Sequence, residues 1–148
     1  MSAAALPGLR LGPRWERLDH GGQQVRLRFA DDEVGVVDLG VRRCSDGRLR
    51  DSYPLSTHDI ELYAVNDAPP LALTRALAEL SQAALDADPL CRRVVFAAPV
   101  DNSDVRKAAE AAGLRHVVDV DVPSAELSLL VCEPHWVARI DLDRVPGS

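Results

Sequence analysis

Two carboxylates, Asp59 and Glu61, stand two residues apart in a segment whose apolar residues are typical of a β-strand. Side chains two apart on a strand point to the same face. Carboxylates that share a face can raise each other's pKa towards neutrality, and a carboxylate tuned in this way can take a proton from a substrate. His58 comes directly before the pair and is a further candidate base near neutral pH. A solvated strand edge and a loop-end surface histidine are the simpler interpretations, and both stay open.

The turn after this strand is a candidate anion site with unusual residues. Residues 59–65 pass through 66–68 into Pro69 and Pro70, where a helix begins. In α/β folds such a turn exposes backbone N–H groups at the positive end of a helix dipole, where phosphates bind. Glycine usually provides the close backbone approach, whereas proline carries no N–H. The turn therefore indicates a ligand-binding architecture whose usual donors are partly missing.

Hydrophobic periodicity predicts an α/β (α+β) domain built on a mixed sheet. Residues 23–30 and 33–41 alternate apolar and polar side chains around Asp31 and Asp32, which is typical of an antiparallel hairpin. Short apolar runs predict further strands near Trp15 and at residues 60–65, 91–98, 116–122, 127–132 and 137–142. Helical periodicity marks residues 71–85 and 104–112, and the second helix ends at Gly113. The core order β-β-β-α-β-α-β-β predicts a central sheet with helices packed on both faces.

Length and composition are those of one globular domain. The chain has 148 residues, 47% of them apolar, which is enough to form a core without metals or disulfides. We expect residues 1–13 to form a flexible N-terminal arm and residues 14–148 to form the domain. The net charge of −6, without any basic run, argues against nucleic-acid binding.

Other sequence signals argue against a metal site and a membrane segment. Cys44, Cys91 and Cys132 are far apart and share no metal-ligand spacing with the four histidines, and we expect the last two to be core residues. No apolar run approaches the ~20 residues of a membrane span. The first residues lack the pattern of a signal peptide. We therefore expect a cytoplasmic protein.

The order of elements and several local sequences together resemble a known family. Leu62-Tyr63-Ala64-Val65, with Arg75-Ala76-Leu77 after the turn, is similar to a strand, pyrophosphate loop and helix that hold acyl-CoA. Asn102-Ser103-Asp104-Val105 through Gly113-Leu114 is similar to a helix that begins at Asn and ends in Gly-Phe. Leu127-Ser128-Leu129-Leu130-Val131 is similar to a final strand. These pieces, over about residues 23–134, resemble the second half of the GNAT N-acyltransferase superfamily.

The resemblance implies transfer of an acyl group from acetyl-CoA or another acyl-CoA to a small-molecule amine. It implies Asp59 or Glu61 as the base. If a bulge splays the strand, the N–H of Val65 or Tyr63 would bind the thioester carbonyl oxygen. The implied cofactor contacts are the amides of Leu71, Ala72, Leu73 and Thr74 together with Asn102. Ordinary sheet pairing, a core role for Tyr63 and plain helix capping by Asn102 are the alternatives.

Three departures from the family pattern favour a second hypothesis. The stretch 69–74 has neither the glycines nor the basic residue of the family loop, and Ala109 stands where many members have a tyrosine that protonates the leaving thiolate. Only Asp31 and Asp32 separate two strands between which the family places two helices. A degenerate GNAT-fold module would act in binding, regulation or assembly, with a protein partner or as a homodimer through its C-terminal strands. A third class, an unrelated α/β domain, would show continuous pairing of residues 59–65 with 91–98.

Overall fold

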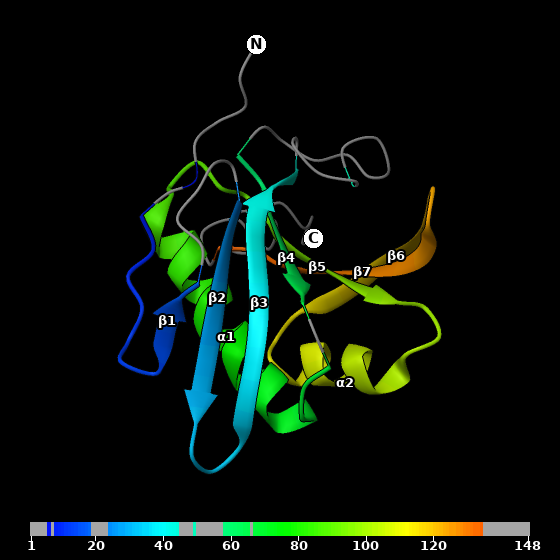
Figure 1. The fold of residues 1–148 in the computed structure, drawn as a ribbon. Coiled ribbons are helices and arrows are strands. Elements are labelled where there is room, and N and C mark those ends of the chain that lie inside the picture. Colours follow the sequence, from blue (N-terminus) through cyan, green and yellow to red (C-terminus); the bar gives the residue numbers. More distant parts are fainter. Residues whose placement is uncertain are drawn as a thin grey trace, which may run out of the picture.

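The computed structural model describes residues 6, 8–18, 24–44, 49, 58–65 and 67–134. Its strands are β1 (Trp15–Arg17), β2 (Gln24–Asp31), β3 (Gly35–Arg43), β4 (Ile60–Ala64), β5 (Val94–Pro99), β6 (Arg115–Val122) and β7 (Ala125–Cys132). Its helices are α1 (Pro70–Ala87) and α2 (Ser103–Ala111) (Figure 1). The strand predicted at residues 137–142 lies outside the described residues. In the described part of the predicted arm, Leu6, Leu9 and Leu11 are half-buried against the core.

The described strands form one mixed sheet in the order β1-β2-β3-β4-β5-β7-β6. Neighbouring strands in it are antiparallel except for β4 and β5, which are parallel. Alternation in the sequence explains the orientation of β2, in which Leu27 and Phe29 are buried while Arg26 and Arg28 are exposed. The mixed α+β fold predicted from the sequence is therefore confirmed, and the strand expected near Trp15 is β1 at one edge of the sheet.

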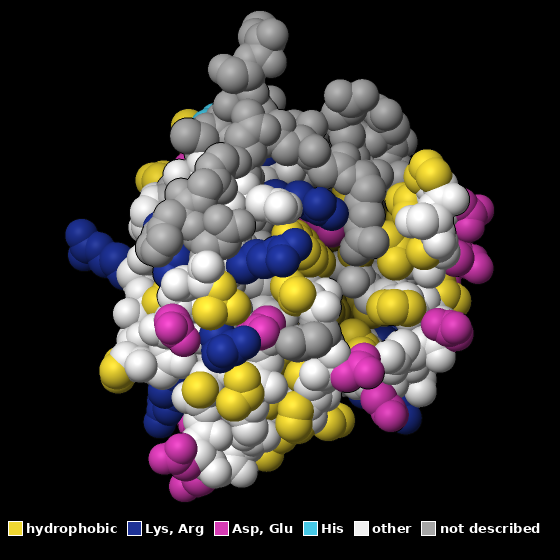
Figure 2. All heavy atoms as spheres, in the orientation of Figure 1, with side chains coloured by type: hydrophobic (Ala, Val, Ile, Leu, Met, Phe, Trp, Pro, Cys, Tyr) yellow, Lys and Arg dark blue, Asp and Glu magenta, His cyan; other side chains and the backbone are white. Residues whose placement is uncertain are grey.

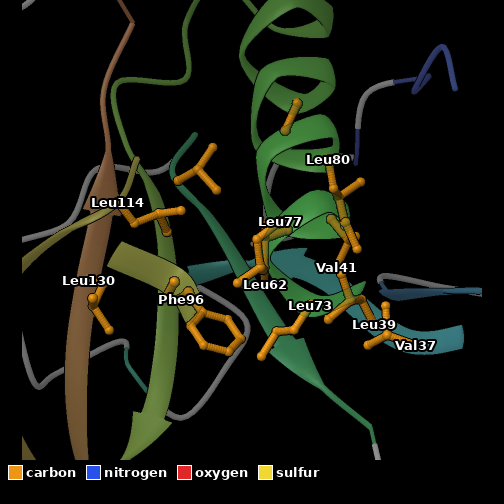
Figure 3. Close-up of a cluster of buried hydrophobic side chains, with 14 of the residues drawn as sticks. Val37, Leu39, Val41, Leu62, Leu73, Leu77, Leu80, Phe96, Leu114 and Leu130 are labelled. Atoms are coloured by element: carbon orange, nitrogen blue, oxygen red, sulfur yellow. The ribbon is translucent and has the colours of Figure 1, made fainter. Parts of the chain in front are cut away.

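Both described helices cover the same face of the sheet. Residues of α1 and α2 belong to one buried cluster with residues of β4 and β5, and Figure 3 shows Leu73 and Leu77 beside Leu62 and Phe96. The prediction of helices on both faces is wrong for this part of the chain. The crossovers β4-α1-β5 and β5-α2-β6 both advance in one direction across the sheet. Because such crossovers are right-handed, both helices are placed on the same side.

The opposite face of the sheet is divided into an apolar and a polar part. Over β5 and β7 it carries a second buried cluster of apolar side chains, which contains Cys44, Leu49, Val95, Ala97, Leu127, Leu129 and Val131. Over β2, β3 and β4 it carries ion pairs between Arg28 and Asp38, 2.8 Å apart, and between Arg42 and Glu61, 3.0 Å apart. The boundary between the apolar and the polar part of this face lies where β4 meets β5.

The described helices include none with both the length and the apolar character needed to cross a membrane.

Candidate functional site

β4 and β5 are paired along only part of their length. The paired residues are Ile60 with Val94, Glu61 with Val95, and Leu62 with Phe96. Both strands continue beyond the last pair, β4 to Ala64 and β5 to Pro99. The continuous pairing expected for an unrelated α/β domain is therefore not what the structure shows. Instead, the two parallel strands diverge at their carboxyl ends.

The divergence opens a cleft of about 830 Å³. Its lining comes from the ends of β4 and β5, the starts of α1 and α2, and β7. Leu73, Phe96 and Leu127 give it an apolar interior, while Arg42, Asp67, Asn102 and Asp104 supply its polar groups. On the face shown in Figure 2, apolar side chains lie in the hollow beside the strands and acidic side chains lie near α2. Ligand sites commonly combine an apolar interior with a few polar groups in this way.

The backbone donor that faces the cleft belongs to Ala64. Val65 donates its N–H to the Asp38 carbonyl oxygen at 3.0 Å, and Ile60 donates to the Arg93 carbonyl oxygen at 3.1 Å. The N–H groups of alternate strand residues point to opposite neighbours. Those of Ile60, Leu62 and Ala64 therefore point towards β5, and Ala64 lies beyond the last pair. The predicted donors, Val65 and Tyr63, point towards β3, and counting the alternation from Ile60 would have identified Ala64.

The start of α1 offers fewer amides than the sequence suggested. Pro69 caps the helix and Pro70 occupies its first turn, so neither provides an N–H. The Leu73 N–H donates to the Pro69 carbonyl oxygen at 3.0 Å, which begins the helical ladder. Of the predicted amides, Leu71 and Ala72 are left in the positions that have no partner within the helix.

Thr74 and Leu73 serve the packing of α1 through their side chains. The Thr74 hydroxyl donates to the Ala108 carbonyl oxygen of α2 at 2.9 Å. Leu73 is buried with 2% of its surface exposed, although its side chain reaches the cleft interior. The sequence pattern could not separate these roles from cofactor binding, because Ala108 lies in another helix.

Asp59 and Glu61 are both buried and both lie outside the cleft lining. Asp59 Oδ1 accepts the N–H groups of Arg92 and Arg93 at 3.1 and 3.0 Å, at the end of β4 away from the cleft. Glu61 pairs with Arg42, with Oε1 3.0 Å from Nε and Oε2 3.3 Å from Nη2. The solvated strand edge is thus wrong for this pair, and the structure does not bring either carboxylate to the cleft.

His58 lies at the same end of β4, away from the cleft. Its Nδ1 is 3.4 Å from Asp88 Oδ2, and its carbonyl oxygen accepts a hydrogen bond from Arg43. Arg43 also pairs with Asp88 at 2.7 Å. His58, Arg43 and Asp88 thus connect the start of β4 to the end of α1, at the opposite end of β4 from the cleft.

Arg42 lines the cleft and was not among the site residues predicted from the sequence. Its guanidinium carbon lies 4.6 Å from the centroid of the Tyr63 ring, and the Tyr63 hydroxyl donates to Gln24 Oε1 at 2.8 Å. The ring crosses Gly40, where an added Cβ would be 2.1 Å from the nearest ring atom. Burial alone would lower the pKa of Arg42, but the hydrogen bond and charge of Glu61 raise it above its ordinary value. Only the cross-strand register, which pairs Arg42 with Glu61, reveals this arrangement.

Asn102 both caps α2 and lines the cleft. Its Oδ1 accepts the Val105 N–H at 3.2 Å, so the capping interpretation is confirmed. Ala109, at the position where a family tyrosine would stand, is completely buried. The described residues contain no group of three or more His, Cys, Asp or Glu side chains that could hold a metal ion.

Comparisons with known proteins identify the fold. No family model and no curated protein matches the sequence. Among solved structures, the aminoglycoside acetyltransferase AAC(6')-Ib in complex with coenzyme A and kanamycin matches with a TM-score of 0.64 at 11% identity, over 80% of this chain and 72% of that one. Mycobacterium smegmatis RimJ in complex with CoA-disulfide matches with a TM-score of 0.55 at 15% identity, over 78% and 56%.

An uncharacterized protein from Bacillus halodurans matches with a TM-score of 0.65 at 17% identity, over 76% of this chain. This chain spans 60% of the length of that protein. At these identities the likeness shows a shared fold and nothing more. The chain shares the fold of these acetyltransferase structures.

Proposed function

We propose that this chain binds an acyl-CoA or a related acyl-pantetheine thioester in the cleft between β4 and β5 and transfers the acyl group to a small-molecule amine. The observation that carries the proposal is the end of strand pairing at Leu62 and Phe96, with both strands continuing. A pantetheine arm contains amide groups, and strand edges that have separated can pair with an extended amide chain. The apolar interior of the cleft suits the methylene groups of that arm.

In the transfer, the amine nitrogen attacks the thioester carbonyl carbon, the C–N bond forms and the C–S bond breaks. The Ala64 N–H is placed to stabilise the negative charge that develops on the carbonyl oxygen. Asp59 and Glu61 lie outside the described cleft lining, so in this proposal the amine loses its proton to solvent before it attacks. As the thiolate leaves, the surplus proton on the newly bonded nitrogen passes to solvent, which also protonates the thiolate because position 109 is an alanine. The chain then acts mainly by positioning the two reactants.

A binding module that holds the thioester without transferring it is the second candidate function. The buried Ala109 and the ion-paired Glu61 favour it, because neither the expected acid position nor the expected base contributes a catalytic group to the cleft lining. The two candidates differ in turnover and share the site.

The predicted homodimer would use β6, at an edge of the described sheet, and sedimentation at micromolar concentrations tests it.

The site is tested by replacing the cleft-facing backbone donor. Ala64→Pro removes the N–H, and we expect it to weaken S-acetylpantetheine binding about tenfold, as the loss of a backbone hydrogen bond in a desolvated site does. Ala64→Val keeps the N–H and serves as the matched control, with affinity within about threefold of wild type. Calorimetry measures both, and circular dichroism confirms that both variants fold. Equal affinity for all three proteins would contradict the placement of the thioester at Ala64.

Turnover separates the two candidates. The protein is incubated with S-acetylpantetheine and a panel of small primary amines, and the acetylated amine is measured by mass spectrometry. A rate above that of the buffer, lost in Ala64→Pro, supports transfer. Binding without any product supports the module.

A further inference from the structure

We infer that the cleft recognises its acyl donor through the pantetheine arm alone, and that the nucleotide diphosphate of coenzyme A adds no affinity. The inference rests on the proposed function of the cleft, and it names which part of the substrate is read. Three features of the cleft support it: the amides at the helix starts, the acidic side chains beside them, and the partners of the nearest arginines.

The start of α1 is built around prolines, which supply no backbone N–H. Gly35, the first residue of β3, has a φ of 115°, and an added Cβ there would lie 3.0 Å from Pro69 Cγ. The start of β3 therefore packs directly against Pro69. With Pro69 and Pro70 lacking N–H groups, the first turn of α1 presents only the Leu71 and Ala72 amides. A phosphate-binding turn normally surrounds its anion with more donors than this.

Two carboxylates line the cleft near the starts of α1 and α2, where a diphosphate would need positively charged or N–H donor groups. Asp67 lies three residues before the start of α1 and Asp104 lies in the first turn of α2, and both line the cleft. Both side chains are exposed. A diphosphate at the cleft mouth would face these two like charges, and the repulsion opposes the attraction of the helix dipoles.

Three arginines in the cleft lining and in the two adjacent helices face carboxylates. Arg42 is the one cation in the described cleft lining, and it pairs with Glu61 at 3.0 Å. Arg75, in α1, lies 3.6 Å from Asp31 of the β2–β3 hairpin. Arg106, in α2, lies close enough to Asp119 to lower the pKa of that carboxyl, whose main stabilising partners are Ser128 and His116. A diphosphate that drew on Arg42 or Arg75 would compete with the carboxylate beside it.

The neutral pantetheine arm avoids all of these costs. It needs the separated strand edges and the apolar interior formed by Leu73, Phe96 and Leu127, and it carries no charge to be neutralised. A pantetheine thioester without the nucleotide should therefore bind as well as the complete coenzyme.

Calorimetry with three ligands tests the inference directly. We expect acetyl-CoA and S-acetylpantetheine to bind with affinities within about threefold of each other, and adenosine 3′,5′-bisphosphate not to bind at about 1 mM. Raising the salt concentration from about 50 to about 300 mM should leave the affinity for S-acetylpantetheine unchanged and should not weaken acetyl-CoA, since the phosphates are repelled and not attracted.

A charge variant adds a matched comparison. Asp67→Asn removes one carboxylate from the cleft mouth, and we expect it to strengthen acetyl-CoA binding about threefold while S-acetylpantetheine binding stays the same. Asp86→Asn is the control, because Asp86 is exposed near the opposite end of α1, about 24 Å along the helix from its first residue, Pro70. It should change neither affinity.

The possible outcomes are distinguishable. Affinity for acetyl-CoA about thirtyfold or more above that for S-acetylpantetheine, falling steeply with salt, would overturn the inference while leaving the proposed function intact. If neither thioester binds at millimolar concentration, the proposed function fails and the inference fails with it. Equal binding of the two thioesters, with a gain for acetyl-CoA in Asp67→Asn, supports both.

Discussion

At its start, β4 is held by hydrogen bonds and by a nearby ion pair, whereas at its end it separates from β5. The first end has the Ile60 N–H on the Arg93 carbonyl oxygen, two backbone N–H groups on Asp59, and Arg43 on Asp88. At the second end, the Val65 N–H donates to the Asp38 carbonyl oxygen of β3 and the Tyr63 hydroxyl donates to Gln24 of β2, while the pairing with β5 has stopped. We call the first the closed end of β4 and the second its open end. The contacts at the closed end keep β4 in the sheet, so that the strand can separate from β5 at the open end.

Among the variants that test this difference between the two ends, we expect the largest loss of stability from replacing Asp59. Asp59→Ala leaves the N–H groups of Arg92 and Arg93 buried without their acceptor, and we expect the free energy of unfolding to fall by about 3 kcal/mol. Asp67→Ala, at the open end, should change it by less than about 0.5 kcal/mol because that side chain is exposed. Urea denaturation followed by circular dichroism measures both.

Asp59 was also predicted from the sequence to be a catalytic base, and the same variants separate the two roles. If Asp59→Ala kept the wild-type stability and lost only acyl transfer, the closed end would not depend on this carboxylate. The comparison of the two ends would then be wrong, and the base assignment would return.

The order of the elements could be predicted from the sequence because it depends on local patterns. Alternation in residues 23–41, the apolar runs of β4 and β5, and Gly113 after α2 each mark an element without reference to the rest of the chain. The sidedness of the helices was missed. It follows from the position of β6 beyond β7, which is a feature of the whole sheet and not of any segment.

The roles of the site residues depended on contacts between distant segments, and there the sequence was a weaker guide. The partners of Asp59 are Arg92 and Arg93, and the partner of Glu61 is Arg42, on a neighbouring strand. Asn102 was placed correctly because a helix cap acts on residues of its own turn. Local chemistry was therefore readable, while the division of β4 into a closed and an open end required the register of its neighbours.

A smaller effect is expected where the open end begins. Gly40→Ala places a Cβ against the Tyr63 ring, which must move off β3 and lose its hydrogen bond to Gln24. We expect the free energy of unfolding to fall by about 2 kcal/mol. In a Tyr63→Ala background the same change should cost much less, since the ring that it meets is gone.

Gly12→Ala is the matched control for this cycle, because no atom lies within 4 Å of a Cβ added at Gly12. Urea denaturation of the single and double variants gives the coupling between positions 40 and 63. Full additivity of the two changes would mean that the ring does not lie across Gly40, and the account of Arg42 stacked on that ring would fall with it.

The smallest expected effect is a change in acid stability at the closed end. Burial alone would raise the pKa of Asp88, but the Leu90 N–H and the Arg43 guanidinium lower it below its ordinary value of 3.8. A carboxyl group whose pKa is lower in the folded state stabilises the fold above its unfolded pKa, and this contribution is lost as the pH falls through the folded pKa. Wild-type protein should therefore lose stability more steeply than Asp88→Asn as the pH is lowered from 5 to about 2. Urea midpoints at a series of pH values measure the difference. Two parallel curves would show that Asp88 binds a proton equally well in both states, so the ion pair with Arg43 would not help to close the start of β4.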